Sequence, residues 1–212
     1  MRRGDGKLQL WTIQSLAAWQ ELERDGVLWC RPVVAEIAFL AAYQWMRDEM
    51  IARIGPPPHE DAYPLWAWYH WHGDHQPKPD MRYSGQLPPG TPGMRIEFSI
   101  PAEQVVLSDF ILWHHVLNGW YLGESLADDA AFELERQRRG LRYPMGHTKK
   151  DGDLEGRVRD SWQRIFALNW VDPDQYLSLP LQEKSVQATL WEVRREQVLK
   201  AELFYGKGKW DA

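Results

Sequence analysis

The sequence has little cysteine, no excess of positive charge and no long apolar run. Its only cysteine, Cys30, excludes an internal disulfide. Lysine and arginine number 25 against 30 aspartates and glutamates, a formal net charge of −5. This balance disfavours binding along an extended nucleic acid. The most apolar stretch, Val33–Met46, is interrupted by Glu36 and Gln44, so it does not predict a membrane-spanning helix.

Several common sequence motifs are missing as well. The chain has no GxxxxGK[ST], no GxGxxG and no GxSxG, which excludes P-loop, dinucleotide-binding Rossmann and esterase sites of the usual kind. Its first residues, Met-Arg-Arg-Gly-Asp-Gly, lack the apolar core of a secretory signal. We therefore expect a cytoplasmic protein that does not enter the membrane.

The remaining composition is that of a globular protein. Apolar residues make up 44% and charged residues 26% of the 212 residues, which excludes a disordered, collagen-like or coiled-coil chain. This length suits one domain with a packed core. Thirteen tryptophans are an unusually large number. Core packing is their commonest use, and stacking on a flat ligand is another.

The N-terminal half predicts strands and helices in alternation. Ser15 is suited to cap a helix that carries Leu16, Trp19 and Leu22 at three-residue spacing and ends at Gly26. The other elements expected here are strands over Leu8–Ile13, Val27–Cys30 and Tyr63–Trp71, and a helix from Pro32 to about Ile54 with a stripe of Val34, Ile37, Ala38, Ala41 and Trp45.

The C-terminal half begins with a strand over Met94–Ile100, in which apolar and polar residues alternate. Ser108 and Asp109 are suited to cap the next helix, and we assign Asp109 as its N-cap. The stripe of that helix, which ends at Gly123, is Phe110, Trp113, His114, Leu117 and Tyr121. The other elements expected are a strand over Val105–Leu107 beside the first, a helix over Asp128–Arg139, a helix with Leu154, Val158, Trp162, Ile165 and Asn169 on one stripe, and a closing hairpin of Val186–Val193 and Val198–Tyr205.

Two segments predict loops: residues 72–93 are rich in proline and glycine, and residues 140–156 form a basic, flexible loop. Together the elements predict a single α+β domain over residues 1–212. We expect a mixed or antiparallel sheet with helices packed on it.

One short string carries metal-binding residue types. His70, His72, Asp74 and His75 fit H-x-H-x-D-H, which resembles the metal-binding signature of metallo-β-lactamase-like hydrolases. Imidazoles two residues apart on an extended segment lie on the same side, and two zinc ions held there would generate a hydroxide. A zinc-dependent hydrolase is therefore one alternative. A solvated histidine-rich loop that binds no metal is the other interpretation.

A wider resemblance covers nearly the whole chain. It is carried by the segments Leu10–Gln14, Tyr43–Met46, Tyr63–Tyr69, Lys78–Arg82, Val106–Phe110, Trp113-His114, Leu117-Asn118 and Gln187–Glu192. In these segments the chain resembles an uncharacterised bacterial family, domain-of-unknown-function family 3841. The resemblance implies a single-domain soluble bacterial protein and no established activity.

Glu192 is a candidate catalytic residue. If Val186, Ala188 and Leu190 face the core, strict alternation directs Glu192 to the same side, where its carboxylate needs a partner. Arg82, Arg95 and His114 are the partners that we expect among the available residues. A buried carboxylate of this kind is either a catalytic group or a member of a structural ion pair, and both interpretations stay open.

The late glutamate, together with an opening strand-helix-glycine-strand unit, resembles in outline the ADP-ribosyltransferase-like enzymes. That resemblance implies NAD as the ligand and a glutamate that orients the nucleophile. The chain departs from the pattern, since Trp11 and Thr12 stand where an arginine or histidine is usual and Gln187 lies five residues before Glu192. Aromatic rings such as Trp68 could stack on a nicotinamide or a base.

The remaining candidates have structural alternatives. His114 lies one turn before Asn118 and is either a core imidazole or a proton-transfer group. Lys78, Asp80 and Arg82 either clamp an anion or belong to a solvated loop.

Our preferred function is a nucleotide- or NAD-handling enzyme with an aromatic-lined cleft. Glu192 and His114 are its expected catalytic residues. The expected ligand-binding residues are Trp11, Gln14, Trp68, Tyr69, Asp80, Arg82 and Gln187. The alternative is a non-catalytic module that binds a protein or peptide through surface tryptophans. Such a module predicts many exposed tryptophans and no deep pocket, whereas an enzyme predicts a concave site.

Overall fold

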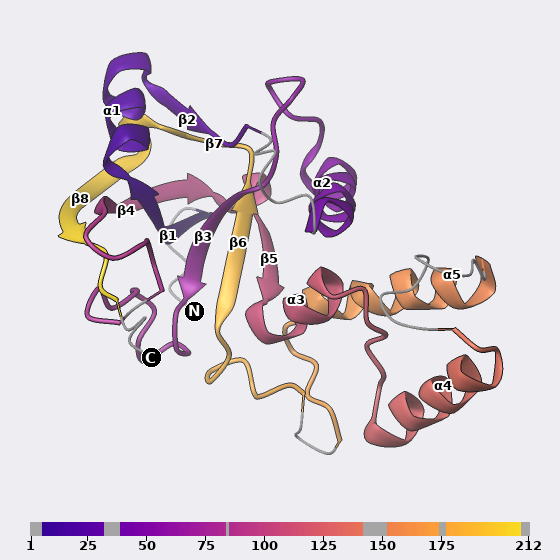
Figure 1. The fold of residues 1–212 in the computed structure, drawn as a ribbon. Helices are drawn as coiled ribbons and strands as arrows, with labels where there is room; N and C mark the ends of the chain where they lie inside the picture. The colour runs from indigo at the N-terminus through magenta and orange to yellow at the C-terminus, as the bar shows by residue number, and fades with distance from the viewer. Residues whose placement is uncertain (1–5, 32–38, 84, 142–151, 174–176, 209–212) are drawn as a thin grey trace.

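The computed structural model describes residues 6–31, 39–83, 85–141, 152–173 and 177–208. Helices and strands follow one another along the chain without any repeated unit (Figure 1). The strands are β1 (Lys7–Ser15), β2 (Val27–Trp29), β3 (Leu65–His70), β4 (Pro92–Pro101), β5 (Val106–Asp109), β6 (Val186–Leu190), β7 (Glu192–Arg194) and β8 (Val198–Tyr205). The helices are α1 (Leu16–Asp25), α2 (Leu40–Ile54), α3 (Phe110–Leu117), α4 (Leu126–Arg138) and α5 (Gly152–Ser161).

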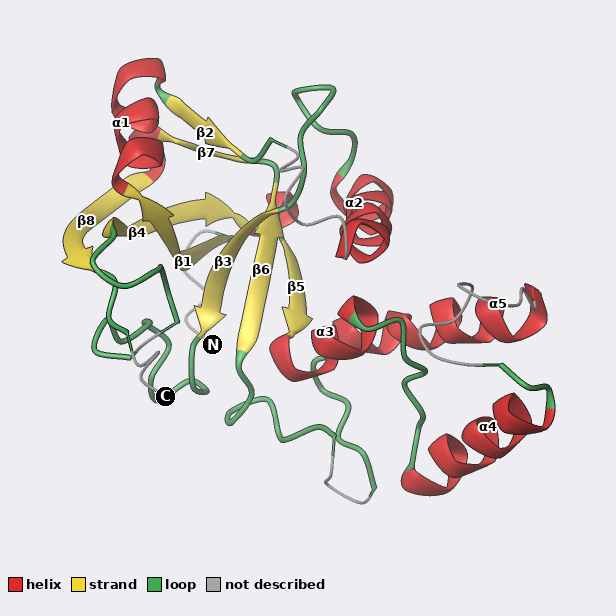
Figure 2. Ribbon diagram, in the orientation of Figure 1, coloured by secondary structure: helices red, strands yellow, loops and turns green. Residues whose placement is uncertain are grey.

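Six strands form an antiparallel sheet in the order β5-β6-β3-β1-β4-β8, and β2 pairs with β7 in a separate two-stranded sheet (Figure 2). The expected α+β class is confirmed. The alternation in β4 buries Met94, Ile96, Phe98 and Ile100, as period two predicts for a half-buried strand.

The two faces of the large sheet carry separate apolar cores. One core packs residues of α2, α3, α4 and α5 against Val106 and Trp66. The other packs Leu22 of α1, Leu28 of β2 and Val193 of β7 against the opposite face. The sheet is therefore covered on both sides at β5 and β3, whereas β4 is half-buried, with Arg95, Glu97 and Ser99 only partly covered.

The predicted opening unit of the chain is confirmed in detail. The Ser15 side chain accepts a hydrogen bond from the backbone N–H of Ala18, which caps α1. The helix ends at Gly26, which adopts a φ of 77° in the left-handed region that glycine tolerates best. β2 follows at once and stops at Trp29.

We expect Ser15→Ala to lower the free energy of unfolding by about 1 kcal/mol, because it removes the hydrogen bond to the Ala18 N–H at an N-cap. Urea denaturation measures the loss, and Ser99→Ala in the middle of β4 is the control. An unchanged midpoint for the Ser15 variant would contradict the capping role.

The predicted closing hairpin is wrong. β6 lies inside the sheet between β3 and β5, whereas β8 pairs with β4 at the far edge. The strand predicted over Val105–Leu107 was expected beside Met94–Ile100. It corresponds to β5, which pairs with β6 rather than with β4. The chain crosses the sheet between these strands, and β7 lies on this crossing segment.

Helix boundaries also differ from the prediction. The buried stripe of α2 is Ala42, Met46 and Met50 rather than the one with Ala41 and Trp45, and its predicted start at Pro32 lies outside the described residues. α3 ends at Leu117, because the chain turns at Gly119 with a φ of 63°.

α5 begins at Gly152, inside the segment expected to be a loop, while residues 142–151 of that segment lie outside the described part. Leu154, Val158, Trp162 and Ile165 are buried as predicted, but Trp162 and Ile165 lie in a 3-10 helix that follows α5, and Asn169 is exposed beyond it. Among the described helices, none has the length and apolar character needed to cross a bilayer.

A buried ion pair fixes the segment before β6. The Lys184 ammonium lies 3.0 Å from Asp109 Oδ2, and the two side chains are only 1% and 4% exposed. It also donates to the Trp170 carbonyl at 2.8 Å and to the Ser178 hydroxyl. Asp109 caps α3 through Oδ1, as predicted. The carboxylate therefore joins α3 to the Lys184 segment.

Candidate active site around Glu192

Glu192 leaves the large sheet before it can face the core as predicted. The strand breaks at Trp191, whose buried indole donates a hydrogen bond to the Gly55 carbonyl at 3.0 Å. The chain then pairs with β2, so that Glu192 lies opposite Trp29. The carboxylate is nevertheless well shielded, since its side chain is only 13% exposed.

Arg194 holds the Glu192 carboxylate, and His59 lies beside it. Arg194 Nε donates to Oε1 at 2.7 Å, and His59 Nε2 lies 3.2 Å from Oε2 at ion-pair distance. The expected partners are wrong, because Arg82 pairs with Asp80 and Arg95 pairs with Glu202.

His59 is itself positioned by an aromatic stack. Its ring lies on the Trp29 indole with centroids 4.5 Å apart and planes 15° from parallel. The guanidinium of Arg31 lies 4.4 Å from the centre of the Trp29 ring. The stack fixes the plane of the imidazole, whose buried Nε2 has no hydrogen-bond partner among the described residues.

Glu192 lies in the wall of a cavity of about 290 Å³. The lining residues are Ile54, Pro58, Ile100, Gln104, Trp191, Glu192 and Arg194. The walls are apolar where α2 and β4 end and polar along β7. Ligand cavities usually measure about 300–1,000 Å³, so this one suits a single ring with an attached sugar rather than a whole dinucleotide.

Three of the predicted ligand-binding residues lie elsewhere, in a row across the large sheet. Trp11 is opposite Trp68 in the register, and Trp68 is opposite Gln187. The Trp11 indole donates to Glu97 Oε2 at 3.0 Å, while Trp68 contacts the rings of Trp71 and Phe110. No member of this row lines the Glu192 cavity. The residues that we expected in a single cleft therefore lie at two separate locations.

The other predicted ligand-binding residues have local partners. Gln14 donates to the Thr12 hydroxyl at 2.7 Å, and the Tyr69 ring stacks on His70. Asp80 and Arg82 bind one another in the loop after β3, and the hydrogen bonds from Arg82 lower the pKa of Asp80 to about 2.

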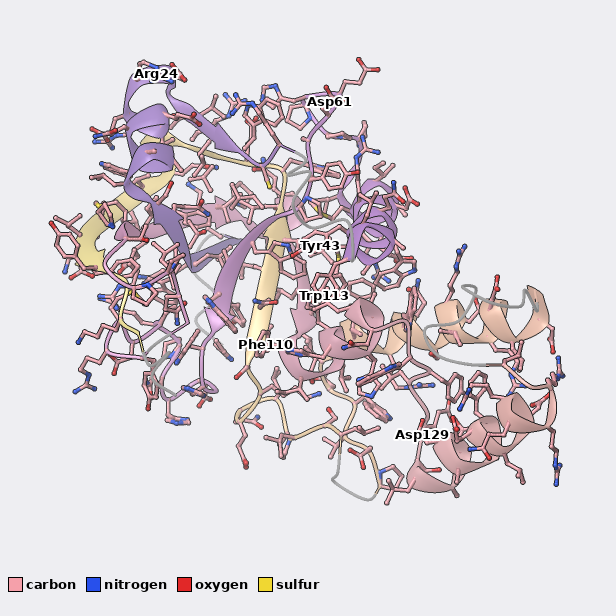
Figure 3. All side chains as sticks on the ribbon, viewed as in Figure 1. Arg24, Tyr43, Asp61, Phe110, Trp113 and Asp129 are labelled. Atoms are coloured by element: carbon pink, nitrogen blue, oxygen red, sulfur yellow. The ribbon has the colours of Figure 1, made fainter. Side chains whose placement is uncertain are left out.

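His114 lies on the outer side of α3. Its ring is exposed and its Nδ1 is 2.9 Å from the Phe110 carbonyl. Trp113 faces the core instead, and Figure 3 shows it beside Tyr43 between α2 and α3, where the two rings meet edge to face. The predicted pairing of His114 with Glu192 is therefore wrong. His114 follows the buried Trp113 by one residue, and this step along the helix directs its imidazole outward.

The side chains of the histidine-rich string do not come together at one point. His70 ends β3, His72 pairs with Gln76 in a tight turn, and the Asp74 N–H donates to the Gln182 carbonyl. Within the described ranges, no three histidine, cysteine or acidic side chains lie close enough together to hold a metal ion. The geometry of His70, His72, Asp74 and His75 therefore does not form the predicted zinc site.

The partly buried imidazoles of His70 and His115 predict a pH dependence of stability. Burial lowers the pKa of both His70 and His115, and the Nδ1 atom of each has no hydrogen-bond partner among the described residues. Because the unfolded state binds protons more readily below a pH of about 6.5, we expect the free energy of unfolding to fall as the pH drops from 7.5 to 5.

Urea denaturation at the two pH values tests this expectation. The double variant His70→Gln with His115→Gln should lose less stability between them than the wild type, and His75→Gln at an exposed position is the control. An equal loss in the double variant and the wild type would contradict the assignment.

Sequence reasoning missed His59, Trp29 and Arg194. His59 lies in the turn after three consecutive prolines, where no periodicity indicates a direction. Arg194 follows Glu192 by two residues, and this spacing places both side chains on one side of a strand, so it is the one local signal available.

The fold and site together define an α+β protein with a shielded carboxylate at a small cavity beside a six-stranded antiparallel sheet. The chain belongs to the family described as domain of unknown function (DUF3841), whose model matches residues 9–199. No curated protein and no solved structure gives a significant match.

Proposed function

We propose that this chain is an enzyme that binds a nucleotide or NAD at the Glu192 cavity and catalyses glycosyl transfer. The observation that carries the proposal is the Glu192 carboxylate, which lies in the cavity wall, accepts a hydrogen bond from Arg194 and has His59 beside it. A carboxylate held in a partly apolar hollow interacts strongly with positive charge that develops beside it.

The chemistry of an N-glycosidic bond suits this arrangement. As the bond from the sugar carbon to the ring nitrogen breaks, its electron pair leaves with the nitrogen and the sugar acquires oxocarbenium character. Glu192 would stabilise that charge or orient the incoming hydroxyl or water, which forms the new bond to the sugar carbon. The Glu192 carboxylate, which lies in the cavity wall, would take the proton that the nucleophile releases.

The flat part of the ligand would meet Trp191 instead of the predicted Trp11 and Trp68. Trp191 lines the cavity. The volume of about 290 Å³ admits the nicotinamide and its ribose but leaves the adenine end of NAD outside. The late glutamate is the feature that this proposal shares with the ADP-ribosyltransferase-like enzymes.

The distribution of tryptophan favours an enzyme over a module that binds through exposed indoles. Of the twelve tryptophans in the described part of the chain, only Trp120 is exposed, at 43%. A protein-binding surface rich in tryptophan predicts several such residues. We further propose that the chain is one domain, because both apolar cores use the same sheet.

The experiment is to incubate the purified protein with NAD, and separately with nicotinamide mononucleotide and with adenosine, and to quantify the released base by chromatography. We expect release of nicotinamide from at least one of the two nicotinamide substrates. Neither release nor binding of any of the three would overturn the proposal.

A further inference from the structure

β8 is an edge strand with an apolar outer surface. Among the described strands it pairs only with β4, and it forms the left margin of the sheet in Figure 1. Leu199, Leu203 and Tyr205 are between 55% and 60% exposed. An edge strand presents unpaired N–H and C=O groups, which other strands can bind.

Pairing with β4 divides the side chains of β8 between the two faces of the sheet. Ala201, Leu203 and Tyr205 share one face, whereas Lys200 and Glu202 share the other. The register with β4 shifts between Val198 and Lys200, so the exposed Leu199 lies at a β-bulge. Within one chain, the Lys200 ammonium lies 2.9 Å from Glu202 Oε1, and the other oxygen of Glu202 binds Arg95.

The sequence of β8 is complementary to itself in one antiparallel register. When Ala201 is placed opposite Ala201 of a second strand, Lys200 lies opposite Glu202 and Leu199 lies opposite Leu203. Opposite charges and apolar pairs directly across two strands stabilise a sheet, whereas like charges destabilise it. A shift of two residues would place Lys200 opposite Lys200 or Glu202 opposite Glu202.

We propose that β8 pairs with β8 of a second copy of this chain in the register centred on Ala201. The two six-stranded sheets then form one continuous twelve-stranded sheet. Leu199 of each chain covers Leu203 of the other, and Lys200 of each chain reaches Glu202 of the other. This inference is independent of the proposed reaction, since the Glu192 cavity contains no residue of β8.

Light scattering after size-exclusion chromatography tests the association. We expect the wild type to have twice the chain mass of 24.9 kDa. Leu199→Glu and Leu203→Lys should each weaken the dimer about tenfold or more, because every substitution places a charge opposite a leucine at two symmetric positions. The two substitutions together should restore it, since Glu then faces Lys. Leu134→Glu, at an exposed leucine on α4, is the matched control.

A disulfide tests the register. In a Cys30→Ser background, Ala201→Cys should cross-link two chains on oxidation, since residue 201 faces its own copy. Leu199→Cys should not, because the two copies of residue 199 would lie about 14 Å apart along the strands. A monomeric wild type, a dimer unaffected by Leu199→Glu, or cross-linking at 199 instead of 201 would overturn the proposal.

Discussion

Replacing Glu192 with glutamine is expected to lower the rate of nicotinamide release by about 100-fold or more, the usual range for loss of a group that stabilises charge or transfers a proton. Glutamine keeps the size of the side chain and removes the negative charge. The effect should fall on kcat more than on KM, because the charge is needed as the glycosidic bond breaks.

The matched control is Glu196→Gln, four residues further along the chain at an exposed position. It removes the same charge from the same region, so the two variants should differ in activity while they melt at similar temperatures. A Glu192→Gln variant with at least half of the wild-type rate would show that the carboxylate has no part in the reaction.

Lys184→Met is expected to lower the free energy of unfolding by about 3–5 kcal/mol, because it leaves the buried Asp109 carboxylate without its cation. Methionine fills similar space but donates no hydrogen bond to the Trp170 carbonyl or the Ser178 hydroxyl. Urea denaturation measures this loss.

The double variant Lys184→Met with Asp109→Asn should be more stable than Lys184→Met alone, since asparagine still caps α3 and carries no charge. Lys7→Met, at an exposed lysine, is the control. A loss below about 1 kcal/mol for Lys184→Met would mean that water reaches the carboxylate and that the pair does not fix the segment.

The parts of the fold that were predictable depend on local interactions. Ser15 and Gly26 delimit α1 through contacts within four residues, and the alternation in β4 is visible without knowledge of its neighbours. Strand pairing depends on distant residues instead. Two adjacent strand-like segments at the C-terminus favour a hairpin, but Trp191 binds Gly55 and directs the chain away from the sheet.

Glu192 is the only residue of the candidate site that could be predicted from the sequence. The pattern of β6 indicated that Glu192 would be shielded and would need partners, and the side chain is indeed 13% exposed. Its neighbour His59 is more than 130 positions earlier in the chain, in a turn without periodicity. Helical spacing placed His114 on a buried stripe, but the packing of Trp113 rotates α3 so that His114 is exposed. The catalytic and ligand-binding roles stay predictions.

The most direct test of the Glu192 site is a titration of the Glu192→Gln variant with NAD, followed by NMR of the indole N–H signals. Trp191→Phe and Trp11→Phe identify the two relevant signals by their loss. We predict that the Trp191 signal shifts as the cavity fills and that the Trp11 signal, whose N–H binds Glu97, stays in place. A shift of the Trp11 signal with an unchanged Trp191 signal would contradict this account and place the ligand on the large sheet.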